Sequence, residues 1–157
     1  MDKVIVTALL VIGAVTAAVV AITTIAPAVS ASSQATGTAA HEASSRILTS
    51  IEIIAVTSNS AGTTVDAWVK NVGATPILGI EKSDVFIITP GIRFEAMTHA
   101  PSGDNSWTEQ PPNSSWNRGD TLHLGITLAA GNPLATGDHT LRISTPNGVT
   151  AEKFFSR

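Results

Sequence analysis

A chain of 157 residues with no cysteine and a formal net charge of −3 excludes a disulfide-stapled fold and a thiolate metal site, and it lacks the basic patch that nucleic-acid binding requires. Charged residues make up 13% of the sequence, which is about half the usual share. The length allows one ordinary domain and an additional helix or tail.

The first element along the chain is an apolar run from Val4 to Val29 that contains no charged side chain. It is longer than the hydrophobic region of a signal peptide, which has about 7–15 residues, and a core helix of a small domain is rarely apolar all round. About 26 residues form a helix of roughly 39 Å, which is enough to cross a membrane. Two hypotheses remain open: a transmembrane helix, and a helix that starts in a membrane and ends in the core of a filament.

Small side chains recur four residues apart along this run and favour close helix packing. Such spacing lets helix backbones approach one another in apolar surroundings. The alternative is that alanine and glycine are simply common in transmembrane helices. The predicted helix–helix packing residues are Gly13, Ala14, Ala17, Ala18 and Ala21.

Near the end of the apolar run, Pro27 predicts a kink, and an Ala/Ser-rich segment follows the run. This segment is either a flexible linker or a continuation of the helix. We predict the helix, ending at about Ser45–Leu48, because alanine is abundant there and proline does not recur.

From about residue 50 the pattern changes to short β-type runs separated by turn residues. In 63–71, Val65, Ala67 and Val69 alternate with polar residues and with Trp68, which predicts a half-buried strand. A Pro-Asn-Gly turn at 145–148 predicts a hairpin. The strands are predicted at 51–57, 63–71, 77–80, 85–89, 92–97, 121–129, 139–144 and 149–155.

About seven or eight strands at this spacing predict an Ig-like antiparallel β-sandwich. The fold class is therefore α+β, with a hydrophobic filament-core or membrane helix at 1–49 and a β-sandwich outer domain at 50–157. Residues 98–119 hold three prolines and two tryptophans and are predicted to be a long irregular stretch, which in a compact domain usually has a function or covers something.

No residue pattern predicts catalysis, a cofactor or a metal. The four histidines are scattered, no G-x-S-x-G elbow is present, and glycines occur singly rather than in a phosphate-binding loop. Calcium binding by Asp104 with Asn105, or by Asp120 with Asp138, is a minor alternative to solvated loop ends. We predict that the protein is not an enzyme.

The candidate contact residues of the outer domain are aromatic. Trp68, Trp107 and Trp116 are predicted to contact neighbouring subunits, as tryptophan often does in interfaces. For Trp107 and Trp116 the alternative is that they close one end of the sandwich. Asn113 begins the one N-x-S/T sequon and is a candidate for N-glycosylation.

The chain resembles the archaellin and archaellum-associated branch of the type IV pilin superfamily over its full length. The resemblance lies in the run from Val4 and in the strand that directly follows the helix. It also lies in the segments WVKNVG (Trp68–Gly73), GDTL (119–122) and TPNG (145–148). Bacterial type IV pilins usually have Glu at the fifth mature position, where this chain has Ile5. The absence of a basic leader leaves two interpretations of the N-terminus, prior removal or a start at Met1.

This resemblance implies a structural subunit of an extracellular helical motility filament, assembled through its N-terminal helix. The implied partners are copies of itself, the membrane before assembly, and an assembly ATPase with its membrane platform, but no nucleic acid. The implied location is the cell surface, with a membrane-inserted precursor. The alternatives are a membrane-anchored stator-type binding protein of the archaellum, an adhesive pilus-like subunit and, last, an anchored hydrolase.

Overall fold

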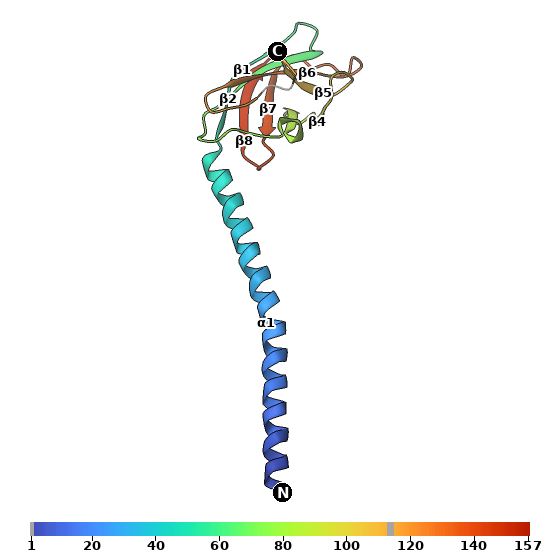
Figure 1. Cartoon of the computed structure of the whole chain (residues 1–157). Helices are drawn as coiled ribbons and strands as arrows, with labels where there is room; N and C mark the ends of the chain where they lie inside the picture. Colours follow the sequence, from blue (N-terminus) through green and yellow to red (C-terminus); the bar gives the residue numbers. More distant parts are fainter. Residues whose placement is uncertain (1, 113–114) are drawn as a thin grey trace. The chain divides into compact units, whose positions relative to one another are not determined.

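The computed structural model describes residues 2–112 and 115–157. It divides into two compact units, Met1–Ala43 and Ser44–Arg157. One helix, α1 (Asp2–Leu48), forms the whole of the first unit and contributes its last turn to the second (Figure 1).

Helix α1 continues through Pro27 and through the Ala/Ser-rich segment to Leu48. Asp2 in the first turn and Arg46 in the last turn place opposite charges where the helix dipole favours them. The prediction of a continuing helix is confirmed, and the flexible-linker alternative is wrong for these residues.

The second unit is a β domain whose described residues form eight strands and one short 3₁₀ turn. The antiparallel hairpin of the first two strands and the hairpin of the last two strands are both as predicted. The elements are β1 (Ile51–Ser58), β2 (Thr64–Asn71), η1 (Ile80–Lys82), β3 (Asp84–Thr89), β4 (Arg93–His99), β5 (Ser106–Gln110), β6 (Thr121–Thr127), β7 (Asp138–Ser144) and β8 (Thr150–Ser156).

The strands are joined in the order β1-β2-β6-β5-β4-β3-β7-β8. All neighbouring pairs are antiparallel except β4 and β5, which pair in parallel over two residues. The strands β1-β2-β6-β5 form one layer and β4-β3-β7-β8 the other, and β1 and β8 approach each other at the open side. This arrangement confirms the α+β class and the Ig-like sandwich, here closed almost into a barrel.

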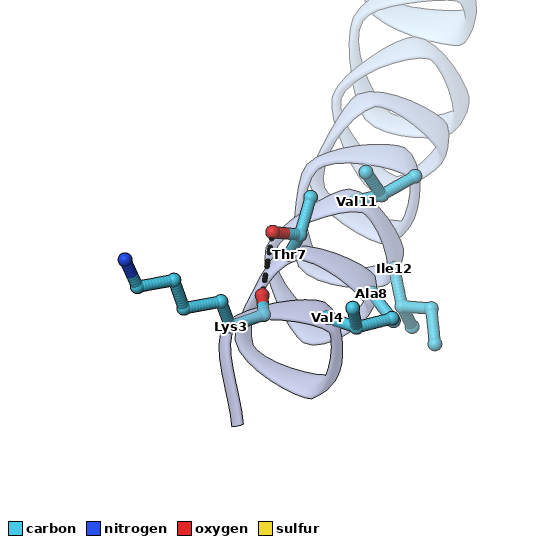
Figure 2. A pocket seen from close by; sticks show the side chains of 6 residues that line it. All are labelled: Lys3, Val4, Thr7, Ala8, Val11 and Ile12. Carbon is cyan, nitrogen blue, oxygen red and sulfur yellow. Dashed lines mark hydrogen bonds between the residues drawn. The ribbon is translucent and has the colours of Figure 1, made fainter. Parts of the chain in front are cut away.

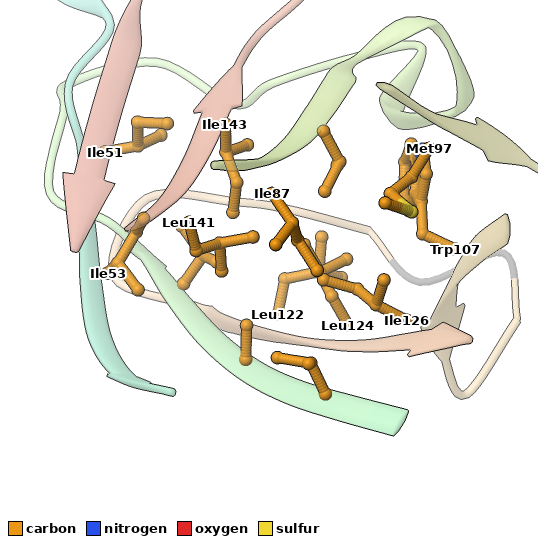
Figure 3. Close-up of a cluster of buried hydrophobic side chains, with 14 of the residues drawn as sticks. Ile51, Ile53, Ile87, Met97, Trp107, Leu122, Leu124, Ile126, Leu141 and Ile143 are labelled. Atoms are coloured by element: carbon orange, nitrogen blue, oxygen red, sulfur yellow. The ribbon is translucent and has the colours of Figure 1, made fainter. Parts of the chain in front are cut away.

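The core lies between the two layers and is built from the alternate, inward-pointing residues of the strands (Figure 3). Val65, Ala67 and Val69 of β2 are fully buried, so the predicted alternation is confirmed. Figure 3 shows side chains from both layers converging on the same space, among them Ile53, Ile87, Leu124 and Leu141.

Two sequence predictions need correction. The stretch 98–119 is not irregular throughout, because it contains the five-residue strand β5, which joins the two layers. The predicted strand at 77–80 forms only one bridge, between Ile77 and Trp116, before the chain turns into η1. Gly79 takes a left-handed conformation with φ 68° at the start of that turn, and this conformation ends any extended pairing.

Candidate functional site

Helix α1 presents an apolar surface with no buried residue. Large side chains from Val4 to Val29 are each more than half exposed. In the part of the chain that the structure describes, α1 is the one helix long and apolar enough to cross a membrane, judged by length and composition. Because apolar area costs about 25 cal/mol per Å² in water, this surface requires apolar surroundings.

The threonines of the apolar run satisfy their hydroxyl groups within the helix. Thr7 Oγ1 donates to the carbonyl oxygen of Lys3 at 2.8 Å (Figure 2), and Thr16 Oγ1 donates to that of Ile12 at 2.9 Å. Thr23 and Thr24, both about two turns further on, donate in the same way to the carbonyl oxygens of Val19 and Val20. Because each hydroxyl group already donates a hydrogen bond within the helix, these threonines can be placed in a lipid or protein interior.

The five predicted packing residues lie on one side of α1 and are all exposed. At about 100° per residue, Gly13, Ala14, Ala17, Ala18 and Ala21 fall within an arc of roughly 140°. A Cβ atom built on Gly13 meets nothing within 4 Å, so the glycine is not required by the chain's own packing. Close approach to another helix remains the prediction for this arc.

Two of the three tryptophans that were predicted to contact neighbouring subunits are buried inside the β domain. Trp107 and Trp116 are only 1% and 2% exposed and belong to the core, so for these two the alternative of closing the sandwich is correct. They are buried because β5, which the sequence did not predict, and the bridge between Ile77 and Trp116 carry them inward. Trp68 is half-buried on the outward face of β2 and stacks on His123 with ring centroids 4.8 Å apart.

The remaining polar candidates make local contacts. His123 Nε2 lies 2.9 Å from Asp66 Oδ1, and Asp138 accepts a hydrogen bond from Ser156. Within residues 2–112 and 115–157, no group of three or more histidine and acidic side chains could hold a metal ion. Asn113, the predicted glycosylation site, lies outside the described residues.

The last turn of α1 is held by the β domain through contacts that the sequence did not predict. The backbone N–H groups of Val72 and Gly73 donate to the carbonyl oxygen of Ser50 at 3.0 and 2.9 Å, and that of Ala74 donates to the carbonyl oxygen of Leu48 at 2.8 Å. A Cβ atom on Gly73 would lie 2.6 Å from that same carbonyl oxygen. Only glycine therefore allows the chain after β2 to lie against the end of the helix.

Two asparagine side chains complete this junction. Asn71 is fully buried and donates to the carbonyl oxygens of Thr75 and Trp116, while its own Oδ1 accepts from Gly73 N at 3.0 Å. Asn147, in the β7–β8 turn, donates to Thr49 Oγ1 at 2.6 Å and to Ser45 Oγ at 3.2 Å. Asn71 and Asn147 belong to the WVKNVG and TPNG segments, which the sequence analysis had singled out. Their role could not be predicted, because the residues to which they hydrogen-bond include Trp116 and Thr49, which are distant in the sequence.

Replacing Asn147 with alanine is expected to loosen the junction by about 1–2 kcal/mol, because it removes hydrogen bonds to the partly buried Thr49 hydroxyl. Hydrogen exchange of the amides at 48–50 should quicken accordingly. Ser102→Ala, an exposed position in the β4–β5 loop, should leave this exchange unchanged. Unaltered exchange in both variants would show that Asn147 does not restrain the helix end.

The fold therefore defines the class as a long apolar N-terminal helix followed directly by an Ig-like β domain. The sequence matches the archaeal-type flagellin family over residues 2–154. The chain belongs to that family.

Individual similar proteins come from several archaea. A curated protein of Archaeoglobus fulgidus, described as uncharacterized, is 30% identical over 159 residues, covering 98% of each chain. The archaellum periplasmic stator protein FlaG from Sulfolobus acidocaldarius is 31% identical with a TM-score of 0.58, covering 69% of this chain and 100% of that one. The archaeal flagellum of Methanospirillum hungatei strain JF1 is 14% identical with a TM-score of 0.71, covering 96% and 90%, and this likeness concerns the fold alone.

Proposed function

We propose that the chain is an archaellin-type structural subunit of an extracellular helical motility filament. The observation that carries the proposal is α1, an unburied apolar helix in a member of the archaeal-type flagellin family. In a filament, the helices of many copies form a central bundle and supply one another with apolar surroundings. The role is mechanical, and no catalytic step is part of it.

Assembly begins in the membrane, where α1 holds the precursor with its β domain outside the cell. Lipid is about as apolar as a helix bundle, so transfer into the filament gains little hydrophobic free energy, and packing of small residues must supply the specificity. An assembly ATPase and a membrane platform provide the work. In water a helix does not dissociate from the finished bundle, because exposing its roughly 26 apolar residues would cost tens of kcal/mol.

One observation favours a second candidate function, a stator protein anchored in the membrane. The identity of 31% extends over the whole of the FlaG stator chain, whereas the archaeal flagellum structure is 14% identical. As a stator, the chain would keep α1 in lipid permanently and use the β domain to contact other archaellum components outside the cell.

Cell fractionation separates the two candidates. Filaments are sheared from cells and their subunits are identified by mass, in parallel with the membrane fraction. We expect this chain to be the major subunit of sheared filaments, because a filament contains many copies of its subunit for each motor. Recovery only in membranes, with filaments built from another chain, would replace the filament role with the stator role.

A further inference from the structure

The turn between β7 and β8 contains the single Asn-Gly pair of the sequence, Asn147-Gly148. Gly148 N donates to the carbonyl oxygen of Thr145 at 2.8 Å, which closes a turn with Pro146 and Asn147 at its two central positions. Gly148 has a left-handed φ of 80°. Asn-Gly is also the pair in which asparagine deamidates most readily, because glycine has no side chain to shield its backbone nitrogen.

Deamidation of Asn147 requires two neighbouring groups of this turn to meet. The backbone nitrogen of Gly148 attacks the side-chain carbonyl carbon of Asn147, and the new N–C bond closes a succinimide ring. The side-chain NH₂ group leaves as ammonia and takes the proton that the Gly148 nitrogen gives up. Water, the one co-reactant, then opens the ring at either carbonyl and leaves aspartate or isoaspartate.

In the folded domain the groups that must meet are held by hydrogen bonds. Asn147 Oδ1 accepts from Thr145 Oγ1 at 2.6 Å. Asn147 Nδ2 donates to Thr49 Oγ1 at 2.6 Å and to Ser45 Oγ at 3.2 Å. The attacking nitrogen of Gly148 is engaged with the carbonyl oxygen of Thr145. Thr49 and Thr145 are only 6% and 3% exposed, so water does not easily take the place of either partner.

Two of these partners come from the end of α1: Ser45 lies in its last turn, and Thr49 follows its last residue. The side chain of Asn147 can turn towards Gly148 N only after it has left both. Ring closure therefore requires a local opening between the helix end and the β7–β8 turn, and the free energy of this opening adds to the barrier of the reaction. The rate at Asn147 thus follows how often the helix end separates from the domain.

The product of the reaction holds the helix end less well. A carboxylate has no N–H group to donate to Thr49 or Ser45. It would also face the carbonyl oxygen of Ser45, which lies 3.4 Å from Asn147 Nδ2, at the helix end where the dipole disfavours negative charge. Arg46, whose Nη2 would lie 3.1 Å from a Cβ atom built on Gly148, attracts the carboxylate and offsets part of this loss.

We propose that Asn147 is a deamidation site that the docked end of α1 keeps unreactive, and that the modified residue releases this end. The change is irreversible, so it links the age of a subunit to the hold on its helix. Every residue involved lies in the second compact unit, Ser44–Arg157. The same chemistry therefore applies to a filament subunit and to a membrane-held stator.

Timed incubation of the purified full-length chain, in detergent and a mildly alkaline buffer, tests the protection. Digestion and mass spectrometry give the fraction deamidated at Asn147, and an isoaspartate-specific methyltransferase identifies the isoaspartyl product. The same buffer with denaturant gives the rate in the unfolded chain. We expect the folded chain to react at least about tenfold more slowly, because ring closure waits for the local opening. Equal rates in the two states would overturn the proposal.

The substitution Ser45→Ala together with Thr49→Val removes both hydroxyl partners of Asn147 Nδ2 and keeps the Asn-Gly pair. The rate at Asn147 should rise at least about fivefold, because the opening no longer breaks these hydrogen bonds. The matched control, Ser44→Ala with Thr57→Val, alters two exposed residues and should leave the rate as it is. An unchanged rate in the first variant would show that the helix end does not protect Asn147.

Asn59 and Asn105, each followed by serine, show in the same digests whether a variant has unfolded as a whole. Global unfolding accelerates deamidation at all three asparagines, whereas the proposed opening accelerates it at Asn147 alone. If the double substitution unfolds the domain, Thr49→Val alone, which nearly keeps the size of the side chain, is measured by the same criterion.

Hydrogen exchange of the amides at 48–50 tests the release of the helix end. Chains modified at Asn147 gain a negative charge and are separated from unmodified chains of the same sample by ion exchange. Their amides at 48–50 should exchange at least about threefold faster, and equal exchange would overturn the release. Neither result bears on the filament or stator role, which the fractionation of sheared filaments and membranes decides separately.

Discussion

Replacing Gly73 with alanine is expected to lower the free energy of unfolding of the β domain by about 2–4 kcal/mol. The new Cβ atom would lie 2.6 Å from both Leu48 O and Ser50 N. Both are backbone atoms, so no side chain can rotate away to relieve the contact. The shift needed would break the hydrogen bonds that Gly73 and Ala74 donate to the segment joining α1 to β1.

Urea unfolding followed by tryptophan fluorescence measures this effect in the β domain alone. Gly131→Ala is the matched control, because a Cβ atom there meets nothing within 4 Å and the substitution should be neutral or stabilising by up to about 1 kcal/mol. Equal unfolding midpoints for the two variants would show that the close approach at Gly73 is not needed. A selective loss in Gly73→Ala would establish that the WVKNVG segment holds the end of the helix.

Replacing Gly13 and Ala17 together with leucine is expected to lower filament yield by roughly tenfold or more, while the chain still reaches the membrane. Both positions lie in the small-residue arc of α1, where leucine would push neighbouring helices apart. The change makes the helix more apolar, so insertion into lipid should not suffer. Sheared filament mass and the amount of chain in the membrane fraction are measured together.

The paired substitution Val15→Leu and Val19→Leu controls for added bulk at the same four-residue spacing. These positions face the opposite side of α1, on average about 150° around the axis from the middle of the small-residue arc. We expect near-normal filament yield from this variant. If both doubles assemble equally well, α1 acts as a plain anchor and the predicted packing arc has no role, a result that would favour the stator function.

The contacts between the end of α1 and the β domain matter for both candidate functions. A filament subunit must pass force between its helix and its outer domain, and a stator must do the same between its anchor and its contact surface. Asn71, Gly73 and Asn147 each hold the segment around the helix end by hydrogen bonds or close backbone contact. Both candidate functions therefore place the same demand on these residues.

Much of the fold could be predicted because its causes are local. Helix α1 follows from an uninterrupted apolar and alanine-rich composition, which needs no distant partner to be recognised. The strand β2 follows from the alternation around Val65, Ala67 and Val69. The β7–β8 hairpin follows from its Pro-Asn-Gly turn, and these together were enough to indicate a helix carrying an Ig-like domain.

The errors concern residues whose environment is made by distant segments. Strand β5 reads Ser-Trp-Thr-Glu-Gln, which has little strand character alone, and it forms because β6 and the end of β4 offer it free backbone partners. Trp107 and Trp116 looked like surface aromatics beside prolines, yet the same pairings carry them into the core. The β-propensity of a short segment depends on its own residues, so it cannot predict pairing with strands that are distant in the sequence.

An apolar helix followed by a β domain can be recognised from the sequence, because hydrophobicity and its period are properties of neighbouring residues. Which side chains remain outside depends on the tertiary structure. It buried two of the three predicted contact tryptophans. It also gave Gly73 its role, since the backbone atoms that exclude a side chain there lie across a junction that forms only when the chain is folded.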